Sequence, residues 1–513
     1  MYRRLKATKD TYITNKIIRN SFRATDANVG EAATLDLFKL YDESEISGDD
    51  TPIELSRLLI KFDLDPLRAL TGSVLDITST TFRCDLKLKD VYGGQTLPSN
   101  FKVIVFPLSR SFDEGVGRDV TKFQDIDAAN FLTASTSGDA ATTWEITGAN
   151  KQGLLGDDNL DIIASGNLSD GDGVKNLWVS QLFSDGTEDL SVDITTIVSA
   201  TLSDQIPDYG FRISFSGTQE TDTATRFVKR FASRHNNNTR KRPTIDVRYN
   251  DAIQDMHGAF FFNLTGSIFL NSFERGQPAN LVSGSGLSRI TGDNSLLVEL
   301  KTGSFERYIT GSQHSYPGGT LFSTGVYSAS FAIDTFGSSA VDVHTTLEQH
   351  VRASGSVTFD TFWQSLDNNV GFHTGSLKIK ESDISGFVND ATRYVVNITN
   401  IKESYKQGRK VRLRFVAFDD TESVKATKLP LYRASEILTK CYYRVRDAYS
   451  DDVIIPFDST FNATLMSTDS EGMYFDIFTD DFEVGRVYTF DVKIDENSTQ
   501  VFQNVGGTFR IDP

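Results

Sequence analysis

The chain has 513 residues, of which 39% are hydrophobic, and it contains 37 Phe and 17 Tyr. This length is too great for one hydrophobic core and favours about three domains, and the apolar content excludes global disorder. The formal net charge of −17 makes the chain as a whole repel nucleic acid and anionic membranes, so neither is expected as a partner.

The N-terminal region, Met1 to Lys16, is basic but lacks the apolar stretch of a secretory signal peptide. No segment approaches the roughly 20 apolar residues of a membrane span, so no membrane insertion is expected. The two cysteines, Cys84 and Cys441, do not support a disulfide framework, and Cys84 is expected to be a small buried hydrophobe. These features predict a protein that folds in the cytoplasm of the cell that makes it.

An alternation of apolar and polar residues with period two dominates the chain. Residues 81–88 place Phe82, Cys84, Leu86 and Leu88 on one face and polar side chains on the other. The same pattern recurs at residues 58–64, 211–215, 245–249 and 488–494. Such runs, bounded by glycine-containing turns, predict half-buried antiparallel strands and an all-β fold.

Helical signals are few. Residues 346–352 place Leu347 and Val351 four apart just before Gly355, which predicts one short helix with a glycine stop. Residues 66–70, which begin with Pro66, predict a single helical turn at most.

Breaks between strands predict three β domains. Residues 1–250 are expected to form an N-terminal β-sandwich or jelly roll. Its end is expected where a strand at 244–249 is followed by the polar pair Asn250 and Asp251. Residues 251–390, rich in Gly, Ser and Thr, and residues 391–513 are expected to form two smaller β-sandwich or immunoglobulin-like domains.

Residues 5–250 carry an ordered set of short phrases. They are Asp10–Ile13, Asn28–Gly30, Thr34–Leu37, Ser56–Leu64, Val105–Leu108, Ser111–Gly115, Trp144, Val192–Thr195, Tyr209–Phe211, Phe231–Arg234 and Arg242–Val247. This set resembles the DNRLRE family, a jelly-roll domain similar to carbohydrate-binding modules. Phe112 stands where that family commonly has Trp, and His235 stands where it commonly has Glu, so no sugar or ion contact is carried over to those positions.

A second resemblance covers residues 250–513 more loosely. It rests on the phrases at residues 276–281, 374–377, 443–445, 453–458 and 472–476. They are similar to virion structural proteins of marine tailed bacteriophages. This resemblance implies a virion component of the tail, baseplate or neck that packs against other virion proteins and copies of itself, and that could anchor fibres. The alternatives are a head decoration protein and an adhesin that binds a host surface glycan.

No sequence motif indicates catalysis, so we expect a protein that is not an enzyme. Phosphate-binding loops, His-Glu-x-x-His and Gly-x-Ser-x-Gly are absent from the sequence. Adjacent acids occur at 113–114, 157–158 and 419–420, where polar turns predict solvated carboxylates with ordinary acidity. A polysaccharide-degrading enzyme that uses Asp113 or Glu114 is the weaker rival.

Two acidic loops contain ligands of the type that Ca²⁺ prefers. They place Asp157 and Asp158, and then Asp170 and Asp172, beside glycines. Neither has the full ligand series of an EF-hand, and plain Asp-Gly turns explain the same residues. We therefore expect no cofactor, with a structural Ca²⁺ at these acids as the alternative.

One basic cluster interrupts the acidic background. It comprises Arg226, Lys229, Arg230, Arg234, Arg240, Lys241 and Arg242. Nucleic-acid binding is one interpretation, because such a cluster could neutralise several phosphates. Because the rest of the chain is acidic, docking on an acidic neighbouring subunit is the interpretation we favour.

The tryptophans allow two interpretations. Trp144 and Trp178 are candidates for stacking against a glycan. Sandwich cores also use such residues, and with abundant Phe the core is the expected place for them.

Overall fold

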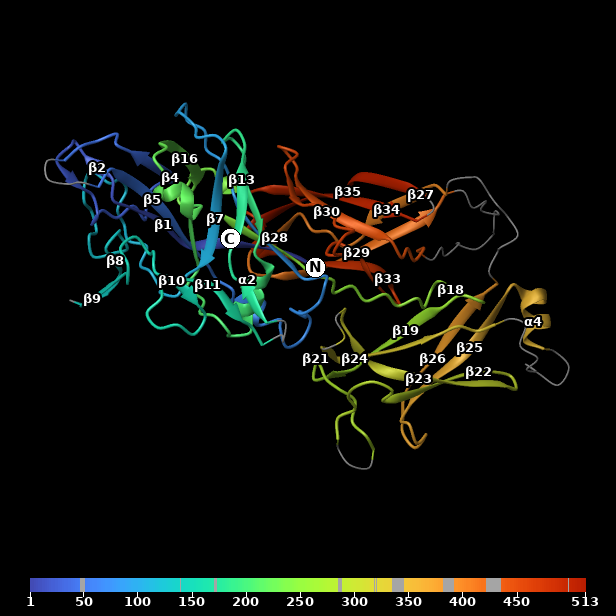
Figure 1. Ribbon diagram of the computed structural model, residues 1–513. Helices are drawn as coiled ribbons and strands as arrows, with labels where there is room; N and C mark the ends of the chain where they lie inside the picture. The colour runs from blue at the N-terminus through green and yellow to red at the C-terminus, as the bar shows by residue number, and fades with distance from the viewer. Residues whose placement is uncertain are drawn as a thin grey trace. The chain divides into compact units, whose positions relative to one another are not determined.

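The computed structural model describes residues 1–46, 51–138, 140–169, 173–284, 288–317, 319, 321–334, 346–381, 392–420, 435–496 and 498–513. The chain divides into two compact units. The N-terminal unit comprises Arg3–Thr71 and Phe82–Arg248, and the C-terminal unit comprises Met1–Tyr2, Gly72–Thr81 and Tyr249–Pro513. Figure 1 labels their strands and helices.

Antiparallel strands far apart in sequence form the main sheet of the N-terminal unit. Its pairing order is β13-β7-β15-β5-β1-β17-β6-β14, and β4 pairs with both β5 and β16. The strands are β1 (Tyr2–Thr14), β4 (Thr34–Tyr41), β5 (Ile53–Phe62), β6 (Arg83–Leu88), β7 (Phe101–Pro107), β13 (Val179–Phe183), β14 (Leu190–Asp193), β15 (Phe211–Phe215), β16 (Arg226–Ala232) and β17 (Thr244–Arg248). This non-sequential pairing is typical of jelly-roll sandwiches.

Shorter elements connect these strands. They are β2 (Ile17–Ile18), β3 (Phe22–Arg23), α1 (Asp65–Arg68), β8 (Thr133–Ser137), β9 (Ala140–Thr143), β10 (Gln152–Leu154), β11 (Ile162–Asn167), β12 (Val174–Asn176), α2 (Thr195–Leu202), α3 (Gly217–Thr221) and η1 (Thr239–Lys241). The single turn predicted at Pro66 is α1. The helix α2 was not predicted, because its β-branched residues disfavour helix formation. Burial of Ile197, Val198 and Leu202 stabilises it instead.

Alternate residues of the sheet fill an aromatic core. Phe101 of β7 stacks on Phe183 of β13 with ring centroids 4.8 Å apart, and Phe215 of β15 lies 5.4 Å from Phe101. Phe183 also contacts Phe231 of β16 at 6.3 Å, although β13 and β16 are not paired. The core therefore lies between β7, β13 and β15 on one side and β16 on the other.

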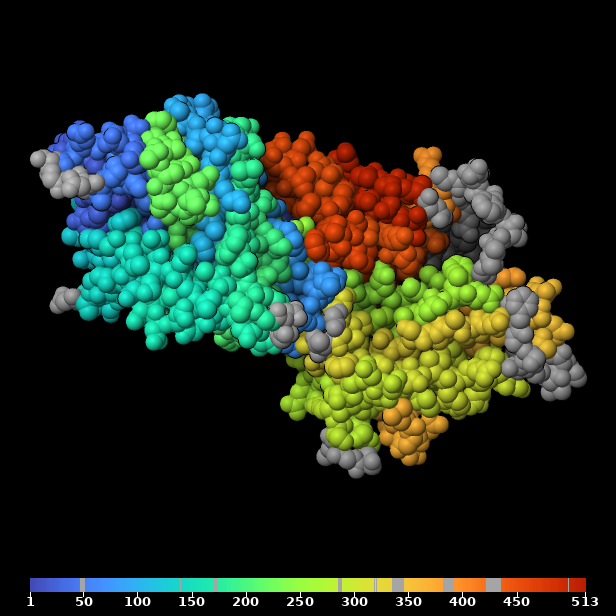
Figure 2. Space-filling model, in the orientation of Figure 1, coloured from blue at the N-terminus to red at the C-terminus, as the bar shows by residue number. Residues whose placement is uncertain are grey.

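A second, smaller core covers the opposite face of the same sheet. It joins Leu59 of β5 and Phe106 of β7 to Phe112, Trp144 and Ile162 from residues 108–167. We call residues 108–167 the covering segment. In Figure 2 the part of the chain that includes it forms a continuous teal surface over its unit. The covering segment therefore removes much of this sheet face from solvent.

The C-terminal unit contains one seven-stranded sheet with its own core. The pairing order is β18-β26-β25-β22-β23-β24-β19. The elements of this region are β18 (Phe260–Phe261), β19 (Gly266–Asn271), β20 (Phe273–Glu274), β21 (Gln277–Pro278), β22 (Leu296–Thr302), β23 (Phe305–Ser315), β24 (Phe322–Phe331), α4 (Leu347–Ser354), β25 (Ser356–Gln364) and β26 (Gly371–Lys380). Leu347 and Val351 of α4 pack into the core around Trp363.

The predicted short helix is confirmed by α4 and its caps. The Thr346 hydroxyl accepts a hydrogen bond from the Gln349 amide, and the Gln349 side chain bonds back to the Thr346 amide. This capping box satisfies amide groups that the first turn leaves without partners. Gly355 ends the helix with a φ of 67°, a conformation that glycine adopts without strain.

The remaining strands form a two-sheet sandwich. One sheet has the order β27-β29-β33-β32, and the other has the order β28-β35-β34-β30-β31. The elements are β27 (Tyr394–Ile398), β28 (Ser404–Lys406), β29 (Lys410–Asp419), β30 (Cys441–Asp447), β31 (Val453–Ile455), β32 (Ser467–Asp469), β33 (Gly472–Phe478), η2 (Thr479–Asp481), β34 (Val487–Asp495) and β35 (Thr499–Asp512). Phe475 of β33 stacks on Tyr443 of β30 at 4.4 Å and closes the space between the sheets.

The all-β class with sandwich-type modules is confirmed. Cys84 is fully buried on β6, as its strand pattern predicts. The three domain boundaries remain a prediction, because the chain divides into two units and the C-terminal unit contains two hydrophobic cores. The predicted boundary at residues 390 and 391 lies outside the described residues. None of the helices that the structure describes is long and apolar enough to cross a membrane.

Candidate functional site

Three distant segments of the N-terminal unit bring together a group of metal-ligand side chains. Asp10 lies on β1, Glu114 follows the end of β7 in the covering segment, and His235 follows the end of β16. One carboxylate oxygen from each acid and one ring nitrogen of His235 all lie within 4.8 Å of one another. We call Asp10, Glu114 and His235 the Asp–Glu–His cluster.

Backbone and guanidinium groups fix the two carboxylates. The Asp10 amide donates to Glu114 Oε1 at 2.8 Å, and the Arg234 amide donates to Asp10 Oδ2 at 2.5 Å. The Arg234 guanidinium donates to both oxygens of Glu114, from Nε and Nη2, at 2.5 Å each. Such a bidentate pair holds a carboxylate in one orientation. The acids are therefore positioned before any ligand binds.

Burial controls the electrostatics of this cluster. Asp10 is fully buried, and the loss of solvation raises its pKa to about 7. The hydrogen bond from the Arg234 amide opposes this rise, and the nearby charge of Glu114 adds to it. The carboxylate of Glu114, in turn, raises the pKa of Arg234. The charges of Arg234 and Arg242 also oppose the rise in the pKa of Asp10 without cancelling it.

Two polar atoms of the cluster have no hydrogen-bond partner. They are Asp10 Oδ1 and His235 Nε2, and both are inaccessible to water. His235 Nε2 lies 3.4 Å from Glu114 Oε1 without a hydrogen bond between them. Buried polar atoms are rarely left unsatisfied, so each such atom requires an explanation. The donor set is that of a site for a cation, and the complete burial of Asp10 favours binding over catalysis on a large substrate.

Sequence reasoning did not find this cluster. Asp10 and Glu114 are 104 residues apart, and Asp10 and Arg234 are 224 apart, so no local spacing indicates them. The prediction that Glu114 is a solvated carboxylate is wrong, because its side chain is 13% exposed and paired with Arg234. Its neighbour Asp113 is 46% exposed and lies 3.7 Å from Lys9 Nζ, in agreement with a solvated acid.

The acids proposed as Ca²⁺ ligands do not form a comparable cluster where they are described. Asp157 and Asp158 are exposed, and Asp157 Oδ2 accepts a hydrogen bond from the Leu154 amide at 2.7 Å. This contact is that of an Asp side chain closing its own turn. Asp170 and Asp172 lie outside the described residues.

Most of the basic cluster is paired inside the N-terminal unit. Arg226 contacts Asp222 at 2.6 Å, Arg230 contacts Asp36 at 2.7 Å, and Arg234 contacts Glu114. The Lys241 ammonium donates to the Asp90 carbonyl at 3.1 Å, and Arg242 Nε donates to the Asn236 carbonyl at 3.1 Å. Arg240 is half-buried on η1. The unit's own acids thus fulfil much of the role that we assigned to a neighbouring subunit.

The prediction that Lys229 contacts another subunit is wrong. Its side chain is 0% exposed, and its ammonium bonds to Asp90 Oδ1 at 2.5 Å and to the carbonyls of Gly186 and Glu188 at 2.8 Å. Phe183 and Phe231 lie 5.3 and 5.0 Å from the same ammonium. Lys229 is therefore a buried cation that three oxygens and two rings stabilise.

The two candidate tryptophans differ in accessibility. Trp144 is 3% exposed within the core under the covering segment, and its indole Nε1 donates to the Asn130 carbonyl at 2.9 Å. The prediction that Trp144 can stack on a glycan is therefore wrong, since its faces contact protein. Trp178 is 37% exposed just before β13, and its candidacy as a stacking platform remains a prediction.

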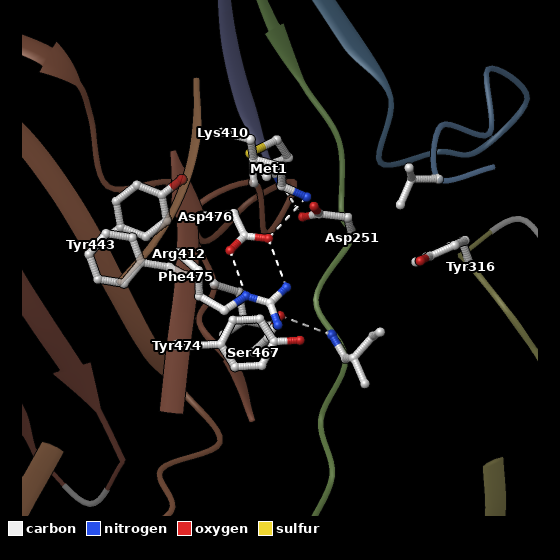
Figure 3. A pocket seen from close by; sticks show the side chains of 14 residues that line it. Met1, Asp251, Tyr316, Lys410, Arg412, Tyr443, Ser467, Tyr474, Phe475 and Asp476 are labelled. Atoms are coloured by element: carbon white, nitrogen blue, oxygen red, sulfur yellow. Dashed lines mark hydrogen bonds and ion pairs between the residues drawn. The ribbon is translucent and has the colours of Figure 1, made fainter. Parts of the chain in front are cut away.

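A pocket in the C-terminal unit brings charged side chains together around the first residue (Figure 3). The Met1 amine donates to Asp251 Oδ1 at 2.6 Å, and burial lowers the pKa of this amine. Arg412 donates to both oxygens of Asp476 at 2.9 and 3.0 Å, and Lys410 lies 3.0 Å from the same carboxylate. Because both carboxylates are paired with cationic groups, we regard the pocket as a structural ion-pair cluster.

Comparison with known proteins yields structural similarity only. No protein-family model and no curated protein matches the chain. The N-terminal Ig1-2 module of the Drosophila receptor protein tyrosine phosphatase DLAR is 9% identical with a TM-score of 0.14, over 51% of this chain and 95% of that structure. The tandem Ig repeats of Dlar are 8% identical with a TM-score of 0.14, over 49% of this chain and 91% of that structure. Similarity at this level carries no argument about activity, and the chain's own strands establish it as an all-β protein.

Proposed function

We propose that the chain is a structural component of a tailed-bacteriophage virion, in the tail, baseplate or neck, with no enzymatic role. In this role its β modules pack against other virion proteins and against copies of the chain. The observation that carries the proposal is the internal packing and charge pairing of the β modules. Sheets line the hydrophobic cores, and buried charged groups of the N-terminal unit and of the C-terminal sandwich are paired within their own unit. Modules of this kind act as stiff building blocks.

The resemblance of residues 250–513 to virion structural proteins supports the same proposal. Exposed aromatic side chains on the C-terminal unit provide contact points for neighbours. Tyr449 is 86% exposed and Phe273 is 65% exposed, and aromatic residues are enriched at protein interfaces. On the N-terminal unit, the part of the basic cluster best placed for docking is Arg240, Lys241 and Arg242, which are half-buried rather than enclosed.

Antibody labelling of intact particles tests this function. An antibody raised against the purified chain is expected to decorate phage particles from a culture that produces the chain, at a fixed position seen by electron microscopy. An antibody against a cytoplasmic host protein serves as the control and should leave the particles bare. Labelling of the head would replace the tail position by head decoration, and particles that bind no antibody would refute the virion role.

Glycan binding at the particle surface is the second candidate function. The observation that favours it is the accessible indole of Trp178, within four residues in sequence of Val174 and Leu182, which are 67% and 62% exposed. Aromatic faces next to apolar surface are suited to stacking on a sugar ring. We expect Trp178→Ala to abolish binding on a glycan array while the module stays folded, since part of the side chain already faces solvent. Equal binding by the variant and the wild type would contradict an adhesin that uses this residue.

A further inference from the structure

We propose that the Asp–Glu–His cluster of the N-terminal unit binds a single divalent transition-metal ion of the zinc class. Asp10, Glu114 and His235 would supply the ligands, and the ion would join β1, the covering segment and the end of β16. This site is independent of the proposed virion function, since a metal-stabilised module could serve any structural role.

The first support is the set of unsatisfied atoms. Asp10 Oδ1 and His235 Nε2 are both buried without a partner, and they belong to side chains that converge with Glu114. An unpartnered histidine nitrogen alone would not carry the proposal, because His314 Nε2 is also buried and unpartnered. His314, however, lies between the rings of Phe269 and Tyr316 at 5.0 and 5.2 Å, and it belongs to no metal-ligand group in the described chain. His235 differs from His314 because the carboxylates of Asp10 and Glu114 lie beside its ring.

The second support is the spacing of the ligand atoms. Zinc lies about 2.0–2.2 Å from nitrogen and oxygen ligands in tetrahedral sites, which places two ligands about 3.4 Å apart. His235 Nε2 and Glu114 Oε1 are separated by 3.4 Å. The pair therefore has the separation of a ligand edge. His235 Nε2 has no hydrogen bond to lose, whereas Glu114 Oε1 also accepts from the Asp10 amide and from Arg234 Nε.

The charge balance also favours a cation. Two carboxylates converge here, and the Arg234 guanidinium neutralises the charge of one of them through its pair with Glu114. The other carboxylate, Asp10, is fully buried, and the charges of Arg234 and Arg242 offset its own only in part, so its ionisation there is costly. A divalent ion would supply the compensation, and the partly exposed edge formed by His235 and Glu114, which are 28% and 13% exposed, gives it a route of entry.

The ligand types select the metal. Ca²⁺ and Mg²⁺ prefer sets composed of oxygen atoms, whereas an imidazole nitrogen combined with carboxylates suits zinc and neighbouring transition metals. We therefore expect zinc to bind in preference to calcium, which differs from the Ca²⁺ that the acidic loops suggested.

Thermal unfolding with added metal tests the site. The full chain is stripped with a chelator and titrated with ZnCl₂ or CaCl₂, while calorimetry reports binding and differential scanning reports the unfolding midpoint of the N-terminal unit. We expect a stoichiometry of one, and a rise in midpoint of about 5–10 °C at a zinc concentration 100 times the dissociation constant. Calcium should produce no comparable rise. Equal stabilisation by calcium, or no stabilisation by zinc, would overturn the proposal.

Matched histidine variants locate the ion. His235→Gln is expected to weaken zinc binding at least about tenfold, whereas His373→Gln, a change at an exposed histidine of β26, should bind like wild type. Zinc binding by His235→Gln at wild-type strength would place the ion elsewhere and refute the site. The midpoint of each variant without metal reports whether it has folded.

A measurement on the unchanged chain keeps the test decisive if His235→Gln does not fold. X-ray absorption spectroscopy of the wild-type chain with one equivalent of zinc is expected to detect oxygen ligands and a single imidazole. A signal from sulfur or from several imidazoles would assign the ion to other residues and contradict the Asp–Glu–His cluster.

Discussion

Replacing Glu220 by Gln is expected to destabilise the N-terminal unit by about 3–5 kcal/mol, because the change leaves two buried guanidinium groups without their counter-charge. Glu220 lies on α3 and is 7% exposed. Arg57 Nε and Nη2 donate to its two oxygens at 3.0 and 2.7 Å, and Arg212 Nη2 lies 3.8 Å from Oε1. The two arginines are 4% and 3% exposed, so water cannot replace the lost carboxylate.

The titration of this group sets the pH range of the effect. Burial alone would raise the pKa of Glu220, but the charge and hydrogen bonds of Arg57 outweigh it, so the pKa lies below its ordinary value of 4.5. Burial, followed by the charge of Arg57, lowers the pKa of Arg212 to about 9. A carboxyl whose folded-state pKa is lowered contributes stability above its unfolded-state pKa and loses it as pH falls. The difference between wild type and variant should therefore be complete near pH 7 and shrink below about pH 4.5.

Urea unfolding measures the loss in free energy of unfolding. Hydrogen exchange of peptides from β7 and β15 shows whether the loss occurs in the N-terminal unit. Glu145→Gln is the matched control, since Glu145 is 38% exposed and pairs with Arg110 at 3.0 Å. Such a surface pair contributes at most about 1 kcal/mol. A Glu220→Gln variant that loses no more stability than Glu145→Gln would show that the buried arginines find other compensation.

The sequence predicts the strands well because their pattern is local. In β6 Cys84, Leu86 and Leu88 are buried as expected, and so are Tyr488 and Phe490 of β34. The expectation that the polar face is solvated is wrong at Asp85 and Asp491, which are buried because arginines pair with them. Alternation cannot identify the sheet partner of a strand. β5 lies between β15 and the two strands β1 and β4, and such long-range pairing depends on side-chain packing across the whole unit.

The same alternation could have predicted in part which side chains of the basic cluster are buried. Lys229 is two residues before Phe231 on β16, so both side chains lie on the face of the strand that enters the core. Arg230 lies on the other face, where it pairs with Asp36. Lys229 and Arg230 both count as positive charges in the sequence. The two-residue period of a strand places them on opposite faces.

The metal-ligand cluster and the two tryptophans could not have been predicted in this way. Asp10, Glu114 and His235 converge only because β1, the covering segment and the end of β16 meet in the folded unit. Trp144 stands between Thr143 and Glu145, whereas Trp178 stands between Leu177 and Val179, so the local sequence would assign the more exposed position to the wrong tryptophan. Their exposure differs because residues 108–167 fold over the sheet and enclose the first of them.

Replacing Trp144 by Ala is therefore expected to destabilise the N-terminal unit by about 3–5 kcal/mol, the cost of removing a large buried aromatic side chain. The change opens a cavity among Phe112, Ala129 and Ile162 and removes the hydrogen bond to the Asn130 carbonyl. Neighbouring backbone that the indole now supports should lose protection as well, which hydrogen exchange of the covering segment can detect.

Trp178→Ala is the matched control, since it removes the same side chain from a 37% exposed position. We expect it to lose clearly less stability than Trp144→Ala, because more than a third of its side chain already faces solvent and no buried hydrogen bond is lost. Equal losses in the two variants would contradict the burial difference between these residues. The comparison also guides the interpretation of a glycan-binding assay. Loss of binding in Trp144→Ala would follow from a destabilised module. Loss of binding in Trp178→Ala, with the module still folded, would identify Trp178 as a glycan contact.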